Sequence, residues 1–134
     1  MVSAVMSTAV SGLMASQTRI ATSANNIANL HSTSTLKNGE YSLEPHHTQR
    51  VLQSAIEPSG GTKAIVQDKN PATTEVYDPD DAAANGDGIT RYPNTSLEEE
   101  LVNGSIIAKE DFKANLKVIK AEDEMLGSLL DIKA

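Results

Sequence analysis

All five prolines of this 134-residue chain lie between residues 45 and 93, so long uninterrupted helices can form only at its two ends. Gly12 is the only glycine between residues 4 and 30. Apolar residues recur in this stretch every seven positions, at Met6, Leu13, Ile20 and Ile27. Such spacing is typical of a helix that packs along a heptad seam. We therefore expect residues 1–32 to form an N-terminal helix, which the polar run 31–35 ends.

A second apolar stripe begins after the last proline. Asn94, Thr95 and Ser96 are all suitable helix N-caps, and glutamates 98–100 follow where the helix dipole favours negative charge. The stripe then keeps a 4-3 spacing over four heptads, through Leu101, Ser105, Ala108, Phe112, Asn115, Ile119, Glu122, Leu126 and Leu129. We expect residues 96–134 to form a C-terminal helix. As polar seam residues, Asn115 and Glu122 are expected to fix register and partner.

The two stripes predict an antiparallel, coiled-coil-like pair of long terminal helices. The N-terminal helix is expected to be buried on more than the seam side. Arg19 is the only charged residue before residue 37, and the helix face opposite the seam consists of Ser, Thr, Asn and Gln. A solvent-exposed helix face normally carries charged residues. Aromatic residues are only 3% of the chain, so a large core is not available to finish the burial. We therefore expect other protein chains to cover the remaining faces.

The middle of the chain reads as short strands separated by turns. The best strands are residues 62–67 and 73–77, and residues 51–56 favour a strand over a helical turn. Turns are expected at Asn38-Gly39, where a hairpin fits, and at 59–61. The predicted fold is mainly α with a small β insertion, organised as a helix over 1–32, a β-rich insertion with a short hairpin over 33–77, an extended acidic loop over 78–95 and a helix over 96–134.

Charge and composition exclude several function classes. The formal net charge is -7, and nine acidic residues lie between residues 68 and 100 against two basic ones, which argues against a nucleic-acid partner. The chain has no cysteine, so disulfide and thiolate chemistry are excluded. The first residues lack the pattern of a secretory signal peptide, and no stretch approaches the roughly 20 apolar residues of a membrane span.

Candidate metal and catalytic sites are weak. The acidic loop (Asp78, Asp80, Asp81, Asn85, Asp87) invites a calcium hypothesis, but in an EF-hand frame starting at Asp81 the third position is Ala83 and the twelfth is Tyr92. His46-His47 has only His31 nearby, and a zinc site needs more ligands. No set of nucleophile, base and orienting residue is recognisable. We expect no enzyme activity, no metal site and no cofactor.

Four segments carry a family resemblance. They are Ser11-Gly12-Leu13 leading to Asn25-Asn26-Ile27-Ala28-Asn29, then Val76-Tyr77-Asp78-Pro79, then Asn85-Gly86 through Gly88-Ile89 to Pro93-Asn94, and finally Phe112-Lys113-Ala114-Asn115-Leu116. The first resembles a motif shared by the rod, hook and hook-associated proteins of the bacterial flagellum. The second and third are more specific, and with them the whole chain most resembles the flagellar basal-body rod protein C family.

The resemblance implies a structural subunit of the proximal rod. Such a subunit is exported by the flagellar type III apparatus, assembles helically in the periplasm with itself and other rod proteins, and forms part of the torque-transmitting drive shaft around the export channel. It also implies that ten stripe residues pair the helices and contact other subunits: Met6, Leu13, Ile20, Ile27, Leu101, Ala108, Phe112, Ile119, Leu126 and Leu129. The family-motif positions are Asn25, Asn26, Asn29, Pro79, Pro93, Asn94 and Asn115.

Other interpretations remain open at this point. The asparagine motif could be no more than a polar helix end, but within the whole-chain pattern it favours hydrogen bonds that join subunits or terminate the helix. The chain could be a diverged flagellar axial paralogue, or an adaptor or export chaperone that uses a helical hairpin to bind partner helices.

Overall fold

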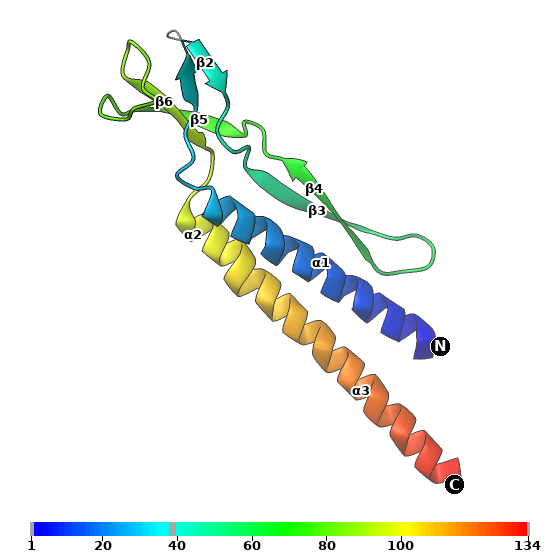
Figure 1. Ribbon diagram of the computed structural model, residues 1–134. Coiled ribbons are helices and arrows are strands. Elements are labelled where there is room, and N and C mark those ends of the chain that lie inside the picture. The colour runs from blue at the N-terminus through cyan, green and yellow to red at the C-terminus, as the bar shows by residue number, and fades with distance from the viewer. Residues whose placement is uncertain (1, 38–39, 134) are drawn as a thin grey trace.

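The computed structural model describes residues 2–37 and 40–133, and two long helices dominate it (Figure 1). Helix α1 spans Val2–Ala28. The second helix comprises α2 (Leu97–Glu100), the π-helical segment η1 (Leu101–Ala108) and α3 (Lys109–Lys133). The helices lie side by side and antiparallel, and the end of α3 extends past the start of α1 (Figure 1). The predicted mainly helical fold with a small β region is confirmed.

Within the described residues, six short strands form three separate two-stranded antiparallel sheets. They pair as β1 (Thr35–Lys37) with β2 (Glu40–Leu43), β3 (Gln49–Ala55) with β4 (Thr62–Asp68), and β5 (Thr73–Tyr77) with β6 (Ile89–Pro93). The strands predicted near 51–56, 62–67 and 73–77 are confirmed. The predicted hairpin turn at Asn38-Gly39 lies outside the described residues. In place of one short hairpin, the middle of the chain holds three.

The hairpin of β3 and β4 lies along α1, opposite the second helix (Figure 1). A hydrogen bond joins this hairpin to α1: the Thr62 backbone N–H donates to Ser11 Oγ at 3.0 Å. At the tip of this hairpin Gly60 and Gly61 have φ angles of 77° and 104°, a conformation that other residues rarely adopt. Helix α1 is therefore flanked by protein on two sides, and its remaining face is open.

The prediction of an extended loop over 78–95 is wrong in two respects. Residues 89–93 form strand β6, because β5 offers a partner along its whole length. The preceding turns are closed by short bonds: Asn85 Oδ1 accepts from the backbone N–H groups of Asp87 and Ile89, and Asp78 N–H donates to Gly88 O. Asparagine and aspartate side chains stabilise turns in this way. The acidic segment is therefore a folded connection.

The second helix begins as expected and then changes register. Ser96 is the N-cap, and its side chain accepts from Glu99 N. The predicted stripe placed Leu101 and Ser105 against α1, but both are exposed, whereas Glu100, Gly104 and Ala108 are buried. The physical reason is the π-helical segment, whose i→i+5 bonding takes up extra residues in each turn and shifts the contacting positions back by one.

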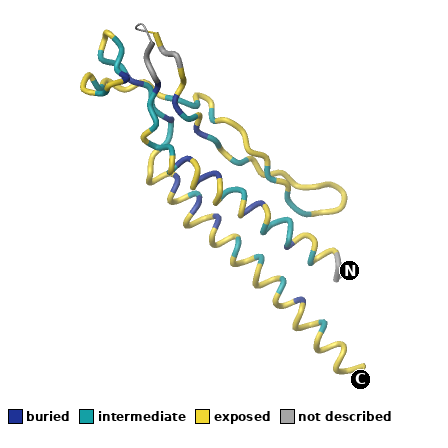
Figure 2. Tube along the Cα trace, in the orientation of Figure 1, coloured by how far each residue is buried: buried dark blue, intermediate teal, exposed yellow. Residues whose placement is uncertain are grey.

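Few residues are buried within the chain (Figure 2), and most of the buried residues are polar. The buried apolar residues among those described are four alanines (Ala9, Ala15, Ala83, Ala108), and Ser16, Thr22, Ser23 and Asn26 are buried on α1. In the predicted seam, Met6, Leu13 and Ile27 are half-buried and Ile20 is exposed, as is Leu129 at 60%. The tight packing between the helices thus uses small residues, and the expected coiled-coil seam stays a prediction.

Candidate functional site at the junction of helices and hairpins

A buried polar cluster is centred on Asn26, near the end of α1, and the relative exposure of Asn26 is 0%. Its Nδ2 donates to Gln49 O at 2.7 Å and to Glu100 Oε1 at 2.9 Å. Its Oδ1 accepts from Gln49 N at 3.1 Å and lies 3.3 Å from His46 Nε2. One side chain therefore binds the start of β3, the start of the second helix and the segment before β3.

Glu100 is the acidic member of this cluster, and only 5% of its surface is exposed. Besides the Asn26 amide, its Oε1 accepts a hydrogen bond from Thr95 Oγ1 at 2.6 Å. A buried carboxylate is costly unless it is hydrogen-bonded. The two donors therefore explain why Glu100, and not the neighbouring Leu101, faces α1.

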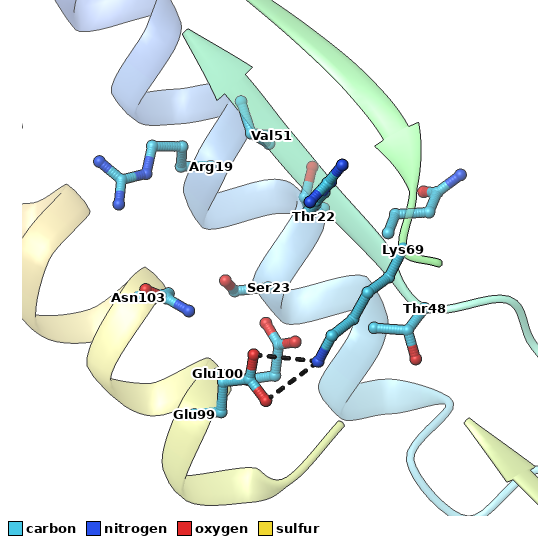
Figure 3. A pocket seen from close by; sticks show the side chains of 11 residues that line it. Arg19, Thr22, Ser23, Thr48, Val51, Lys69, Glu99, Glu100 and Asn103 are labelled. Atoms are coloured by element: carbon cyan, nitrogen blue, oxygen red, sulfur yellow. Dashed lines mark hydrogen bonds and ion pairs between the residues drawn. The ribbon is translucent and has the colours of Figure 1, made fainter. Parts of the chain in front are cut away.

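A polar cavity of about 280 Å³ opens beside this cluster (Figure 3). Its wall includes Arg19 and Ser23 from α1, Val51 from β3 and Asn103 from η1. Lys69, which follows β4, points across it: its Nζ donates to Glu99 Oε1 at 3.2 Å and to the backbone oxygen of Asn94 at 3.0 Å (Figure 3).

The helices come closest at two glycines, Gly12 on α1 and Gly104 on η1. A Cβ placed on Gly104 would lie 2.6 Å from Ser23 Cβ, and one on Gly12 would lie 2.6 Å from Asn115 Oδ1. Real Cβ atoms do not approach neighbours this closely. Gly104 therefore needs glycine for the observed spacing, because Ser23 Cβ cannot move without its backbone, whereas a side chain at position 12 would require the Asn115 amide to turn away. Between them, Arg19 Nη1 and Asp111 Oδ2 form an ion pair at 3.3 Å.

A second polar cluster holds the turns before β6. Tyr92 Oη donates to Asp81 Oδ2 at 2.8 Å and to Asp78 Oδ2 at 3.1 Å. The hydrogen bond to Asp81, together with burial and the second aspartate, raises the pKa of Tyr92 to about 12. Two of the carboxylates considered as calcium ligands are thus occupied by a phenol. Within residues 2–37 and 40–133 no group of three or more His, Cys, Asp or Glu is placed to hold a metal ion.

The family-motif residues have separate structural roles. Asn29 Nδ2 donates to Asn25 O at 2.9 Å, which caps the end of α1. Asn94 Nδ2 donates to Pro71 O at 2.8 Å, and Asn115 Nδ2 donates to Asp111 O at 2.9 Å. The buried Pro93 ends β6, and the exposed Pro79 lies beside Gly88. The structure does not gather these residues into one site.

Sequence reasoning missed Asn26 as the centre of the junction, together with its partners Gln49 and Glu100. Two adjacent asparagines such as Asn25-Asn26 give no indication of which one is buried. A helical wheel does carry a weak signal, because Asn26 lies on the same side of α1 as Arg19 and Ser23, which contact the second helix. The identity of the partner on β3 had no signal in the sequence.

Large apolar side chains are exposed along the second helix. They occur near its start, at Leu97, Leu101, Val102, Ile106 and Ile107, and again along α3, at Leu116, Val118, Met125, Leu129, Leu130 and Ile132. In the described part of the chain, no helix has the length and apolar character to cross a membrane. Long terminal helices with uncovered apolar faces define a class of structural protein whose burial is completed by other chains.

The comparisons with known proteins agree with this class. A family model described as "Flagella basal body rod protein" matches residues 6–34. The flagellar basal-body rod protein FlgC of Buchnera aphidicola is 31% identical, over 91% of this chain and 90% of the relative. FlgC of Borreliella burgdorferi is 31% identical over 92% of each chain, and FlgC of Yersinia enterocolitica is 29% identical over 91% and 90%.

This chain belongs to the flagellar basal-body rod protein C family. It is accordingly a structural protein of the flagellar basal body, and its relatives are named as rod proteins and not as enzymes.

Proposed function

We propose that this chain is a subunit of the proximal rod that assembles helically, through its terminal helices, with copies of itself and with other rod proteins. In this proposal the helices stack around the export channel and help to form the shaft that transmits motor torque. The chain reaches the periplasm through the flagellar type III export apparatus.

The observation that carries the proposal is the open face of α1. Val10, Met14, Gln17, Ala21, Ala24 and Ala28 follow one another at spacings of four and three, and so lie along one side of the helix. Val10 is half-buried and the other five are exposed. None is charged. Because helix faces that meet water normally carry charge, this face is suited to contact with another protein surface.

The intrachain contacts of α1 lie on its other side. Gly12, Arg19 and Ser23 meet the second helix, and Ser11 meets β4. A substitution on the open face can therefore disturb assembly without removing a contact inside the subunit. This separation makes the proposal testable with point variants.

The test uses a strain that lacks the gene and is complemented with variants. Ala21→Glu places a charge on the open face, and we expect it to abolish motility and rod assembly while the altered chain is still exported. The matched control, Lys63→Glu, changes an exposed charge on β4, outside the terminal helices, and should leave swimming intact. Normal swimming and normal basal bodies in the Ala21→Glu strain would refute assembly through this face.

The same strain separates the alternatives. A diverged axial paralogue is also incorporated into basal bodies, but deletion of its gene leaves a principal rod subunit and a complete rod. An export chaperone or adaptor is instead retained in the cytoplasm, and basal bodies purified from the wild type contain none of it.

A further inference from the structure

The junction between α2 and α3 departs from an ordinary helix in a way that decides which residues meet α1. Glu100, Gly104 and Ala108 are buried and stand four residues apart, whereas an α-helical stripe alternates spacings of four and three. The π-helical segment Leu101–Ala108 accommodates the extra residue. Short π-helical stretches inside α-helices are rare and are frequently found at functional sites.

Two contacts hold this register. Asn26 Nδ2 donates to Glu100 Oε1 at 2.9 Å, and Ser23 packs against Gly104 with no room for a Cβ. The charged hydrogen bond is buried, so it favours this register by a factor of roughly 10 to 100 over one in which it is absent.

The same sequence offers a second register. If the segment were α-helical, Leu101 and Ser105 would take the places of Glu100 and Gly104, and they continue the 4-3 stripe that runs through Ala108 to Leu129. Ser105 has a Cβ where Gly104 has none, so the segment must stand further from Ser23 in that register. The residues from Ala108 onward keep their partners in both registers. The segment has apolar residues on all sides, with Leu101, Val102, Ile106 and Ile107 exposed, so neither register leaves it with a polar outer face.

We propose that Leu101–Ala108 is a two-register switch in the helix pair, and that the Asn26–Glu100 hydrogen bond is its latch. In the latched register Glu100 and Gly104 face α1. In the released register the segment is α-helical, and Leu101 and Ser105 face α1.

The switch is connected to the β5–β6 hairpin. Only Asn94, Thr95 and Ser96 separate β6 from α2, and Asn94 is fixed to the hairpin side by its bonds to Pro71 and Ala72. When the π-helical turn becomes α-helical, it accommodates one residue fewer. The part of the helix before it then rotates by about 100° relative to the part after it. The rotation must pass through this three-residue connection, so the hairpin and the helix pair change their mutual orientation together.

In the rod, such a change lets one sequence fit neighbours at different positions of a helical wall; this use rests on the proposed function, whereas the switch itself does not. The released register also turns Leu101 inward and Glu100 outward. The surface that a neighbouring subunit meets therefore differs between the two states.

Engineered cysteines read the register directly, since the natural chain has no cysteine. The pair Ser23→Cys with Ser105→Cys reports the released register, in which these two side chains face each other. Gly104 is left unchanged, because a side chain there would itself disfavour the latched register. The pair is introduced into otherwise unaltered chain, Glu100→Ala chain and Glu100→Gln chain. Basal bodies are isolated and oxidised, and disulfide is measured by intact mass after the free thiols are alkylated.

In the otherwise unaltered background we expect the 23–105 pair to stay largely reduced. Glu100→Ala removes the latch, and we expect the 23–105 disulfide to rise at least about tenfold. Glu100→Gln keeps an acceptor for Asn26 and Thr95, and should behave like the unaltered chain. Absence of any 23–105 disulfide in the Glu100→Ala chain, with the chain still present in basal bodies, overturns the switch. Absence from basal bodies of the chain with no substitution at all overturns the proposed function instead.

A deletion provides the second test. Without Ser105, Ala108 follows Glu100 by seven positions in place of eight, which is close to two α-helical turns, so both residues still face α1. We expect this chain to enter basal bodies and to show no response to Glu100→Ala. Deletion of the exposed Val118 in α3 is the matched control, because it rotates the rest of the helix by about 100° and should abolish incorporation. Equal loss in both deletions contradicts the π register.

Discussion

Replacement of Asn26 should destabilise the fold strongly, although its side chain is small. Replacing it with alanine removes two hydrogen bonds to the backbone of Gln49 and one to the buried Glu100 carboxylate. Neutral hydrogen bonds contribute about 0.5–1.5 kcal/mol each and one to a charged group about 1.5–3 kcal/mol. We expect Asn26→Ala to lower the free energy of unfolding by about 3–5 kcal/mol, a large part of the 5–15 kcal/mol that is typical of domains.

The assay is urea unfolding of the purified chain, followed by far-ultraviolet circular dichroism. With a urea m-value of about 1.5 kcal/mol per molar, the midpoint should fall by roughly 2–3 M. The control is the adjacent Asn25, which is exposed and interacts only with Asn29 among the described contacts. Asn25→Ala should change the free energy of unfolding by less than about 0.5 kcal/mol.

The comparison of Asn25→Ala with Asn26→Ala tests whether the buried Asn26 amide organises the junction. Similar losses for Asn25→Ala and Asn26→Ala, or a loss below about 1 kcal/mol for Asn26→Ala, would show that the buried amide does not organise the junction. A double-mutant cycle with Glu100→Ala isolates the Asn26–Glu100 bond, and a coupling energy near zero would remove it from the argument.

Four further substitutions and one titration follow from the same contacts. Gly104→Val forces a side chain into the space of the facing serine and should cost about 1–3 kcal/mol in the same assay, whereas Gly127→Ala meets nothing within 4 Å and should gain up to about 1 kcal/mol; a neutral Gly104→Val would contradict the close approach. Ile27→Asp and Leu126→Asp should each block rod assembly and motility while export stays measurable, and swimming of both strains would reject these seam positions. Tyr92 should ionise near pH 12 and not near 10, so its stabilising bonds are fully present below pH 10 and lost as the pH rises to about 12; phenolate absorbance of the wild type against a Tyr92→Phe variant checks this, and a wild type in which every tyrosine titrates near 10 contradicts it.

The sequence predicted elements whose signals are local. The strand over residues 73–77 matches its observed bounds, and Ser96 caps the second helix as its type and the following glutamates suggested. Strand β6 was missed because turn residues dominate the composition before it, whereas its existence depends on pairing with β5. Pairing between distant segments has no local signature.

The register of the second helix could not be counted from the sequence for a related reason. A 4-3 count assumes 3.6 residues per turn, and by that count Leu101 is a better seam residue than Glu100. The count fails because Asn26 and Thr95 supply donors that only the folded junction brings to Glu100. The role of Asn26 was missed for the same reason, since its partners come from three separate elements.

The unequal reach of the two helices has a consequence for any array of such subunits. The last turns of α3 pass beyond the start of α1, while the three hairpins gather around the opposite end and flank of the pair (Figure 1). Copies laid in one orientation therefore present bare helical tips at one terminus of the array and hairpins toward the other. Under the proposed helical assembly, the two termini would therefore offer different surfaces to an added subunit, and the shape of each subunit would set the direction of elongation.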